Sequence, residues 1–455
     1  MVVTTRVVAD RPATVTDQLL RDAVQVLIHN WHGHSTVPSR SLYPHQWSWD
    51  SAFIALGLRH WAPRRAATEL LSLFGAQWSD GRIPHIAFNP AVDPDAYFPG
   101  PTFWRSADGV GRPPIDTSGI IQPPVHATAA VAVVDGLGED GLTFARRAYP
   151  CLVAQHDYLR RRRSVGPAGL AAVVHPWETG MDNSPSWDTP LHAVPADLSL
   201  FDTYTRRDLE HAGTAERPTD EDYARYIRLA LAYRDQGYDD DWVRAEGEFR
   251  VVDPAFNALW AWAEIALADL AGRIGADPTG HRAEAVRLTR ALVDQLWSAE
   301  AGVFVARNVR TGQRLSERTV SGLIPLVLPD LPADIVTAVH ETLVGNAFRV
   351  GRAYGVPSFD LTDPRHDPQR YWRGPSWLNT TWLVASGLRQ HGYADLAARL
   401  DSDLVALTAQ SGLREYFHPL TGTGHGTDRF SWSAALLIDV LLRDAPERVA
   451  GHDQP

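Results

Sequence analysis

The chain has 455 residues, 44% of them hydrophobic and 21% charged, as in a soluble globular protein with one large domain or two medium ones. Its net charge of −11 argues against nucleic acid or an anionic membrane surface as a partner. All 43 basic side chains are arginine, which excludes chemistry that needs a lysine. The single cysteine, Cys151, excludes an intramolecular disulfide and is expected to be a buried small hydrophobe.

The N-terminal sequence lacks the basic and apolar segments of a secretion signal. No uncharged apolar run reaches the roughly 18 residues that a membrane span needs. We therefore expect a cytoplasmic protein with no membrane partner. A homo-oligomer is left open.

Helical periodicity dominates the chain and predicts helices in most of it. In chain order they cover residues 15–29, 50–59, 64–78, 126–134, 142–162, 220–233, 253–272, 279–297, 322–328, 333–344, 376–391, 394–409 and 431–442. Short turns join some neighbours, whereas long, aromatic-rich connections occupy 79–124, 164–219 and 358–375.

This number of helices in one chain is typical of an α-solenoid or of a closed barrel of helical hairpins, (α/α)6. A solenoid predicts a repeat with a fixed period, and the sequence has none. The long, uneven loops favour an all-α (α/α)6 barrel in one domain, residues 1–455, whose loops build one site. Residues 185–250 have weak periodicity and are expected to form a small cap or insertion.

Four loop segments place aromatic residues beside charged ones. They are SLYPHQWSWDSAF (41–53), HPWETGMDNSPSWD (175–188), RYWRGPSW (370–377) and REYFHP (414–419). An aromatic ring can stack on a sugar face while a neighbouring acid accepts from its hydroxyls. A core aromatic beside a helix-capping acid is the alternative for each; Asp50, for example, also fits an N-cap.

Hydrolysis of a glycosidic bond needs one protonated and one ionised carboxyl group. An aromatic, partly dry pocket raises the pKa of an acid, and Asp182 fits that position. Glu178 and Asp188 are rivals, with alternative roles as caps or partners of arginine. Glu415 is the candidate for the second carboxylate, since Arg414 beside it would favour its ionised form.

Other chemistries fit less well. The histidines of HNWHGH (29–34) match no zinc protease spacing and are better explained as a helix C-terminus. DNSPSWD lacks the glycine of a calcium loop. GLGEDG (136–141) has the glycine spacing of a nucleotide-binding turn, but no strand–helix–strand unit follows, so a turn between helices is favoured. No metal or cofactor is expected.

The four segments occur in order together with QPPVHA (122–127), RPTDEDY (217–223) and FSWSAALL (430–437). In this combination the chain resembles glycoside hydrolase family 63, and within it the short bacterial enzymes that act on mannosylglycerate and glucosylglycerate. The resemblance runs from about Leu42 to the C-terminus, and WETGMDNSP and YWRGPSW are its specific signatures.

The resemblance implies an (α/α)6 barrel and hydrolysis with inversion, with Asp182 as general acid and Glu415 as general base. An inverting pair of carboxyl groups is expected roughly 6.5–9.5 Å apart. The resemblance implies a sugar subsite formed by Tyr43, Trp47, Trp49, Asp50, Gln122, Trp177, Gly180, Trp372 and Trp377. It implies a glycerate subsite formed by Arg217, Tyr223, Tyr371 and Tyr97.

The charge of the chain agrees with this role of Arg217, because a glycerate carboxylate entering an acidic protein needs a local cation, which Arg217 could supply. A surface salt bridge with Asp220 or Glu216 is the alternative. One departure concerns Phe430, where some glucosylglycerate hydrolases have glutamine. The sequence thus predicts an inverting α-glycosidase for a small glyceryl glycoside. A related enzyme for a neutral disaccharide, a non-catalytic sugar-binding toroid and a solenoid interaction protein are the alternatives.

Overall fold

The computed structural model describes residues 14–210 and 213–444, and every statement of absence below concerns these residues. The first thirteen residues, which carry much of the prediction about a secretion signal, lie outside them. Among the described helices, none combines the length and the apolarity that would let it cross a membrane.

Most of the described chain is helical. The α-helices are α1 Val15–His29, α2 Ser48–Leu58, α3 Pro63–Phe74, α4 Pro101–Trp104, α5 His126–Leu137, α6 Gly141–Tyr158, α7 Asp188–His192, α8 Asp220–Asp235, α9 Asp240–Glu246, α10 Pro254–Ile274, α11 Thr279–Leu296, α12 Ala333–Val344, α13 Leu378–Gln390, α14 Ala394–Ser411 and α15 Ser431–Leu442. The bounds of α1, α12 and α15 are as predicted.

In the part of the chain that the structure describes, ten two-residue strands form five antiparallel pairs in the connections. They are β1 Gln46–Trp47 with β2 Ile86–Ala87, β3 Ser164–Val165 with β4 Leu170–Ala171, β5 Val251–Val252 with β8 Arg307–Asn308, β6 Trp297–Ser298 with β7 Val303–Phe304, and β9 Tyr416–Phe417 with β10 Gly424–His425. These pairs fix the loops that the sequence predicted to carry the site.

The structure differs from the prediction in several places. Residues 322–328 do not form an α-helix but two 3-10 turns, η8 Val320–Gly322 and η9 Ile324–Val327, where Pro325 has no N–H to continue a helix. Helix α6 passes into a π-helical turn, η3 Leu159–Arg163. The short helices α4, α7 and α9 were not predicted.

Six elements follow one another in a closed ring of contacts. Helix α2 packs against α5, α5 against α10, α10 against η9, η9 against α13, α13 against α15, and α15 returns to α2. A second layer lies outside the ring, where α3, α6, α11, α14 and α1 pack against α2, α5, α10, α13 and α15. All residues of α2 are buried, whereas α11 is buried on one face, as expected of an inner and an outer helix.

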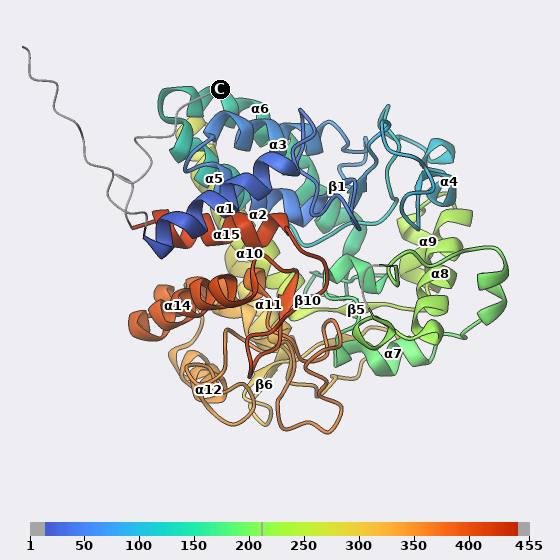
Figure 1. Ribbon diagram of the computed structural model, residues 1–455. Coiled ribbons are helices and arrows are strands. Elements are labelled where there is room, and N and C mark those ends of the chain that lie inside the picture. Colours follow the sequence, from blue (N-terminus) through green and yellow to red (C-terminus); the bar gives the residue numbers. More distant parts are fainter. Residues whose placement is uncertain (1–13, 211–212, 445–455) are drawn as a thin grey trace, which may run out of the picture.

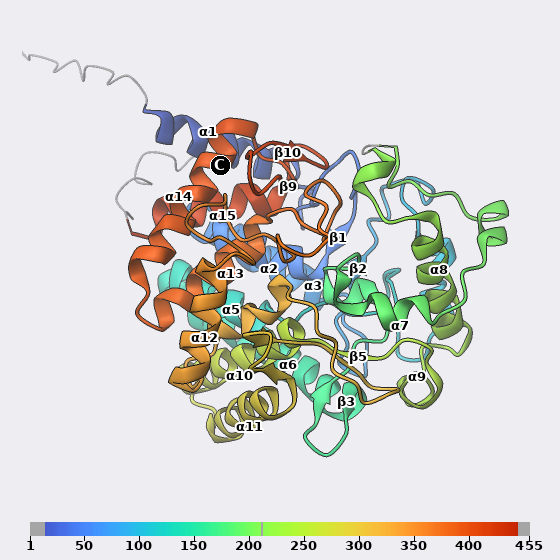
Figure 2. The same cartoon turned by 90° about the horizontal axis from the view of Figure 1, so that it is seen from below.

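The N-terminal and C-terminal helices lie side by side. In Figures 1 and 2, α15 (red) runs next to α1 and α2 (blue), in agreement with their contacts. Segment 185–250 contains α7, α8 and α9 and lies at one side of the molecule in both views, where α8 packs against α7.

Three smaller predictions can be compared with the structure. Helix α1 ends at His29, so the prediction of a helix C-terminus in the histidine-rich segment is confirmed. GLGEDG joins α5 to α6 through the turn η2 Gly138–Asp140, which confirms the turn between helices. Cys151 is only half-buried on α6, because this face of the helix is partly open to solvent.

Candidate active site

The four aromatic–acid segments meet at one cavity of about 90 Å³, which has space for several water molecules. Each of the four contributes to its wall. Thirteen of the fifteen predicted site residues line it: Tyr43, Trp47, Trp49, Asp50, Tyr97, Gln122, Trp177, Gly180, Asp182, Arg217, Tyr223, Tyr371 and Glu415.

The other two predicted residues, Trp372 and Trp377, lie behind the wall. Both are fully buried and stack in parallel with ring centroids 3.8 Å apart. Trp377 packs against Tyr371 at 5.1 Å and Trp372 against Trp49 at 6.4 Å. They support two rings of the wall rather than line the cavity, because this stack fills the core beneath it.

Seven lining residues were not predicted: Pro38, His85, Phe98, Asp208, Pro218, Phe430 and Trp432. His85 reaches the site because β1 pairs with β2, and its ring lies parallel to Trp177 with centroids 6.3 Å apart. Phe430 and Trp432 belong to the FSWSAALL segment, so their place beside Glu415 had a signal in the sequence. Asp208 had none.

Asp182 lies in a turn whose backbone is fixed from two sides. Its carbonyl oxygen accepts from Trp187 Nε1 at 2.8 Å and from the Tyr226 hydroxyl at 2.9 Å. Gly180 has a φ of +69°, and a Cβ there would lie 2.4 Å from the ring of Trp49. Glycine is therefore required twice, for the left-handed backbone and for the close approach to Trp49.

Burial raises the pKa of the Asp182 carboxyl from 3.8 to about 7. Arg217 opposes this shift, whereas Asp208 and Glu415 add to it. A carboxyl group with this pKa keeps a large protonated fraction at neutral pH, as a general acid must.

The two rival carboxylates of the same segment are engaged with arginine. Glu178 is fully buried in a bidentate ion pair with Arg163. Asp188 forms a bidentate pair with Arg373 at 2.9 and 2.7 Å. Neither lines the cavity. The alternative roles predicted for them, as partners of arginine, are confirmed.

Glu415 immediately precedes β9, and three donors converge on its carboxylate. The Tyr43 hydroxyl donates to Oε1 at 2.9 Å, while Arg217 and the backbone N–H of Thr427 donate to Oε2 at 3.0 and 3.2 Å. Arg414, which was expected to favour the ionised form of Glu415, is not one of these donors. The Arg414 side chain packs beside Gly424 at the base of the hairpin, and Arg217 takes its place.

Arg217 is buried, so its alternative role as a surface salt bridge is wrong. Besides Glu415, its guanidinium donates to the Tyr43 hydroxyl at 3.0 Å and lies 4.7 Å from the ring centre of Tyr371. Asp220, its predicted alternative partner, pairs with Arg206 instead. Arg217 is thus a fixed cation in the cavity wall.

Asp50 and Gln122 also form part of the cavity wall. Asp50 lies in the first turn of α2 but does not cap it, because the helix begins at Ser48. Burial raises the pKa of its carboxyl well above the usual range. Gln122 Oε1 accepts from the Trp49 backbone N–H at 3.1 Å, which fixes the amide in the cavity wall.

Tyr97 and Tyr223 line another part of the cavity with Asp208. The Tyr223 hydroxyl donates to the Phe98 carbonyl at 3.2 Å. Arg206 lies 4.3 Å from the Tyr223 ring centre and holds Asp208 through two hydrogen bonds. This arrangement joins segment 185–250 to the loop that carries Tyr97.

The described residues contain no group of three or more histidine, cysteine or acidic side chains arranged to hold a metal ion. The cavity wall offers an acid of raised pKa, a hydrogen-bonded carboxylate, a guanidinium and aromatic faces.

Residues 43–433 match the model of the mannosylglycerate hydrolase MGH1-like glycoside hydrolase domain. The chain belongs to this family. The match spans both Asp182 and Glu415, and the resemblance to glycoside hydrolase family 63 is confirmed. The protein is therefore a glycoside hydrolase.

Relatives in this family align over nearly the whole chain. Mannosylglycerate hydrolase of Rubrobacter radiotolerans is 41% identical, covering 95% of this chain and 99% of its own. Glucosylglycerate hydrolase of Mycolicibacterium hassiacum is 34% identical, covering 94% and 99%. The crystal structure of a family 63 mannosylglycerate hydrolase from Thermus thermophilus with Tris and D-glycerate has a TM-score of 0.85, with 42% identity and coverage of 92% and 99%.

Proposed function

We propose that the protein hydrolyses a 2-O-α-glycosyl-D-glycerate to the free sugar and D-glycerate, with inversion at the anomeric carbon. The observation that carries this proposal is Arg217, a buried cation in the wall of a small cavity that also holds Asp182 and Glu415. A neutral disaccharide has no group that needs such a cation. The names of the relatives agree with this substrate class, and mannosylglycerate is the first member to assay.

Asp182 is the proposed general acid. Its carboxyl, half-buried in the cavity wall and with a pKa of about 7, keeps a proton near neutral pH and gives it to the glycosidic oxygen as the bond to C1 breaks. Its turn, fixed by Trp187 and Tyr226, holds the carboxyl in one orientation. Asp50, Gln122 and Trp177 are the proposed sugar ligands, through hydroxyl contacts and stacking.

Glu415 is the proposed general base. It takes a proton from water while the water oxygen bonds to C1 on the face opposite the leaving group. Across the reaction one water is consumed: its hydroxyl joins the sugar, and glycerate leaves with the proton from Asp182. Asp182 then regains a proton and Glu415 loses one, which restores both groups for the next turnover.

Beside Glu415 in the cavity wall, Arg217 is the proposed partner of the glycerate carboxylate, assisted by the hydroxyls of Tyr97, Tyr223 and Tyr371. We also infer that the closed ring of inner and outer helices is an (α/α)6 barrel of one domain, supported by the return of α15 to α2. Segment 185–250 would be its cap, since it brings Asp208, Arg217 and Tyr223 to the cavity.

A substrate panel tests the function. Mannosylglycerate, glucosylglycerate, the matching glycosylglycerols without a carboxylate, and neutral α-linked disaccharides are compared by kcat/KM, and NMR identifies the anomer formed first. We expect hydrolysis of a glyceryl glycoside with the β-anomer appearing first, and a loss of roughly 100-fold for the glycosylglycerol. Faster hydrolysis of a neutral disaccharide would overturn the proposed substrate, and no turnover at all would favour a sugar-binding toroid.

A further inference from the structure

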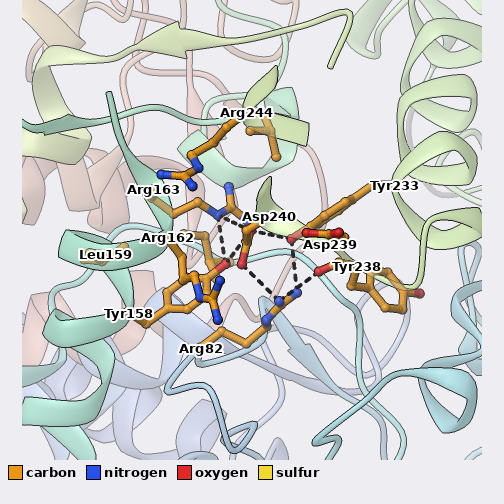
Figure 3. Close-up of polar contacts among 12 residues, drawn as sticks. Arg82, Tyr158, Leu159, Arg162, Arg163, Tyr233, Tyr238, Asp239, Asp240 and Arg244 are labelled. Atoms are coloured by element: carbon orange, nitrogen blue, oxygen red, sulfur yellow. Dashed lines mark hydrogen bonds and ion pairs between the residues drawn. The ribbon is translucent and has the colours of Figure 1, made fainter. Parts of the chain in front are cut away.

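A buried ionic cluster lies beneath the segment that carries Asp182. Figure 3 shows Arg82 and Arg163 on either side of Asp240, with the hydroxyls of Tyr158 and Tyr233 directed at the same carboxylate. Arg82 approaches Asp240 at 3.1 Å and Arg163 at 2.9 Å. The cluster joins the turn before β2, the π-helical turn η3 and the N-terminus of α9.

Arg163 extends this cluster to the acid segment. Its two terminal nitrogens donate to Glu178 Oε2 and Oε1 at 2.8 and 2.7 Å, and both side chains are fully buried. Glu178 precedes Asp182 by four residues, within the turn η4 Pro176–Thr179 that ends at Gly180. The ion pair is therefore attached to the backbone that leads directly to the proposed acid.

Glu178 also accepts hydrogen bonds from the backbone of two other segments. Its Oε2 accepts from the backbone N–H of Val174 at 2.8 Å, and its Oε1 accepts from that of Ile121 at 3.3 Å. Ile121 is followed by Gln122, which holds the Trp49 backbone. One carboxylate thus sets the position of the acid turn and of the segment that presents Gln122 to the cavity.

Stability alone is a weak explanation for this pair. Two buried charges gain little net free energy over well-packed apolar side chains of the same volume, because desolvation offsets their attraction. A bidentate pair does impose a single geometry on the groups it joins.

We propose that Glu178, held by Arg163, is a positioning residue that keeps Asp182 in place in the wall of the cavity. The inference rests on the proposed role of Asp182 as the general acid. It gives Glu178 a function in the reaction although Glu178 does not line the cavity, and it explains why a second carboxylate lies so close to the first in sequence.

The pH dependence of catalysis reports on this positioning. The Asp182 carboxyl owes its raised pKa first to burial, so a relaxed turn that admits water would lower it. The ionisable groups that interact electrostatically with Asp182 belong to several elements, and replacing Glu178 alters none of them. They are Arg217, Asp208, Glu415, Tyr97, Tyr223, Tyr226 and Tyr371.

The test is the kcat/KM profile against pH for Glu178→Gln, which keeps the size of the side chain but removes its charge from Arg163. We expect the basic limb to move about one pH unit lower and kcat to fall about tenfold or more, with KM changed less. An unmoved limb in a folded variant would contradict the proposal. If Glu178→Gln does not fold, Arg163→Lys, which keeps the charge and loses the bidentate contact, should move the limb in the same direction.

Asp240→Asn is the matched control. It alters the same buried cluster and the same Arg163 but contacts neither the acid turn nor Ile121. We expect it to lower Tm and leave the limb in place. A shift equal to that of Glu178→Gln would mean that the cluster acts only through general loosening, and would overturn the specific role of Glu178.

An Asp182→Asn variant, assayed in parallel, separates the two proposals. On the α-mannosyl and α-glucosyl fluorides, whose leaving group needs little protonation, it should keep far more activity than on the glyceryl glycoside. If Asp182→Asn retains wild-type activity on the glycoside, the proposed function fails. If it loses that activity while Glu178→Gln leaves the limb unmoved, only the positioning role fails.

Discussion

Arg217 donates a 3.0 Å hydrogen bond to Glu415 Oε2, and the two side chains are 2% and 1% exposed. The cation proposed for the glycerate carboxylate is therefore also the partner of the proposed base. A substrate carboxylate would contact the same guanidinium, so binding of the aglycone and the environment of the base are coupled. Replacing Arg217 should therefore slow the hydrolysis of a neutral substrate as well as that of a charged one, because both reactions use Glu415.

The first prediction concerns Arg217→Lys. One ammonium group cannot keep the contacts to both Tyr43 and Glu415, so the base loses a fixed partner. We expect kcat/KM for the glyceryl glycoside to fall about 100-fold, and hydrolysis of the α-glycosyl fluoride to fall about tenfold. Steady-state kinetics measure both.

Arg414→Lys serves as the control, because Arg414 precedes Glu415 in sequence but has no hydrogen bond to its carboxylate in the structure. It should remain near wild type. Undiminished fluoride hydrolysis by Arg217→Lys would show that Arg217 serves the aglycone alone.

The second prediction concerns the pH profile of the unaltered enzyme. Asp182 must be protonated to act, and burial raises its pKa to about 7. As the pH rises through this value the protonated fraction falls, so kcat/KM should decline tenfold per pH unit above about 7. A basic limb that begins below pH 5 would mean that the acid is not buried as the structure describes.

The third prediction concerns Gly180→Ala. A Cβ at this position meets the Trp49 ring at 2.4 Å and strains a backbone with a φ of +69°. The acid turn or Trp49 must move, so we expect at least a tenfold loss of kcat/KM. Activity and Tm are measured together.

Gly275→Ala is the matched control. Gly275 has a φ of +80° at the C-terminus of α10, and no atom lies within 4 Å of its added Cβ. It should cost about 1 kcal/mol of stability and leave activity unchanged. Equal activity losses in the two variants would assign the effect of Gly180→Ala to folding alone.

The fourth prediction concerns stability in acid. Burial would raise the pKa of Asp439, but hydrogen bonds from His60 and Arg59 outweigh it and lower the pKa from 3.8 to about 2. The ionised form therefore stabilises the fold above pH 3.8, and this contribution is lost as the pH falls through 2. Asp439→Asn should lower the free energy of unfolding by about 2 kcal/mol at pH 7.

Urea unfolding of both proteins at several pH values measures this contribution. The difference between wild type and Asp439→Asn should shrink between pH 4 and pH 2. A difference that stays constant over this range would place the effect of Asp439 in packing rather than in charge.

The sequence was informative about the site because each wall segment carries its own local pattern of aromatic and acidic residues. Trp49, Asp182 and Glu415 were found in this way. The resemblance placed Trp372 and Trp377 in the sugar subsite, whereas in the structure they stack beneath the cavity wall. The distinction depends on which face of the loop the fold buries.

Contacts between residues far apart in the sequence could not be predicted from local sequence patterns. Arg414 was chosen for Glu415 because it is adjacent in sequence, whereas the fold brings Arg217 from 198 positions away. His85 reaches the cavity through a two-residue strand pair that is too short to leave a pattern. Residues 322–328 read as a helix because they are apolar throughout, yet Pro325 limits them to 3-10 turns.

The contact of α15 with α1 and α2 has a consequence for biosynthesis. Chains leave the ribosome N-terminus first, and α2 emerges as a mostly apolar helix, all of whose residues are buried in the folded protein. Its last neighbour, α15, is translated almost four hundred residues later, together with Glu415 and Trp432. Until then the nascent chain carries the acid without the base, and an unprotected apolar helix that a chaperone could recognise.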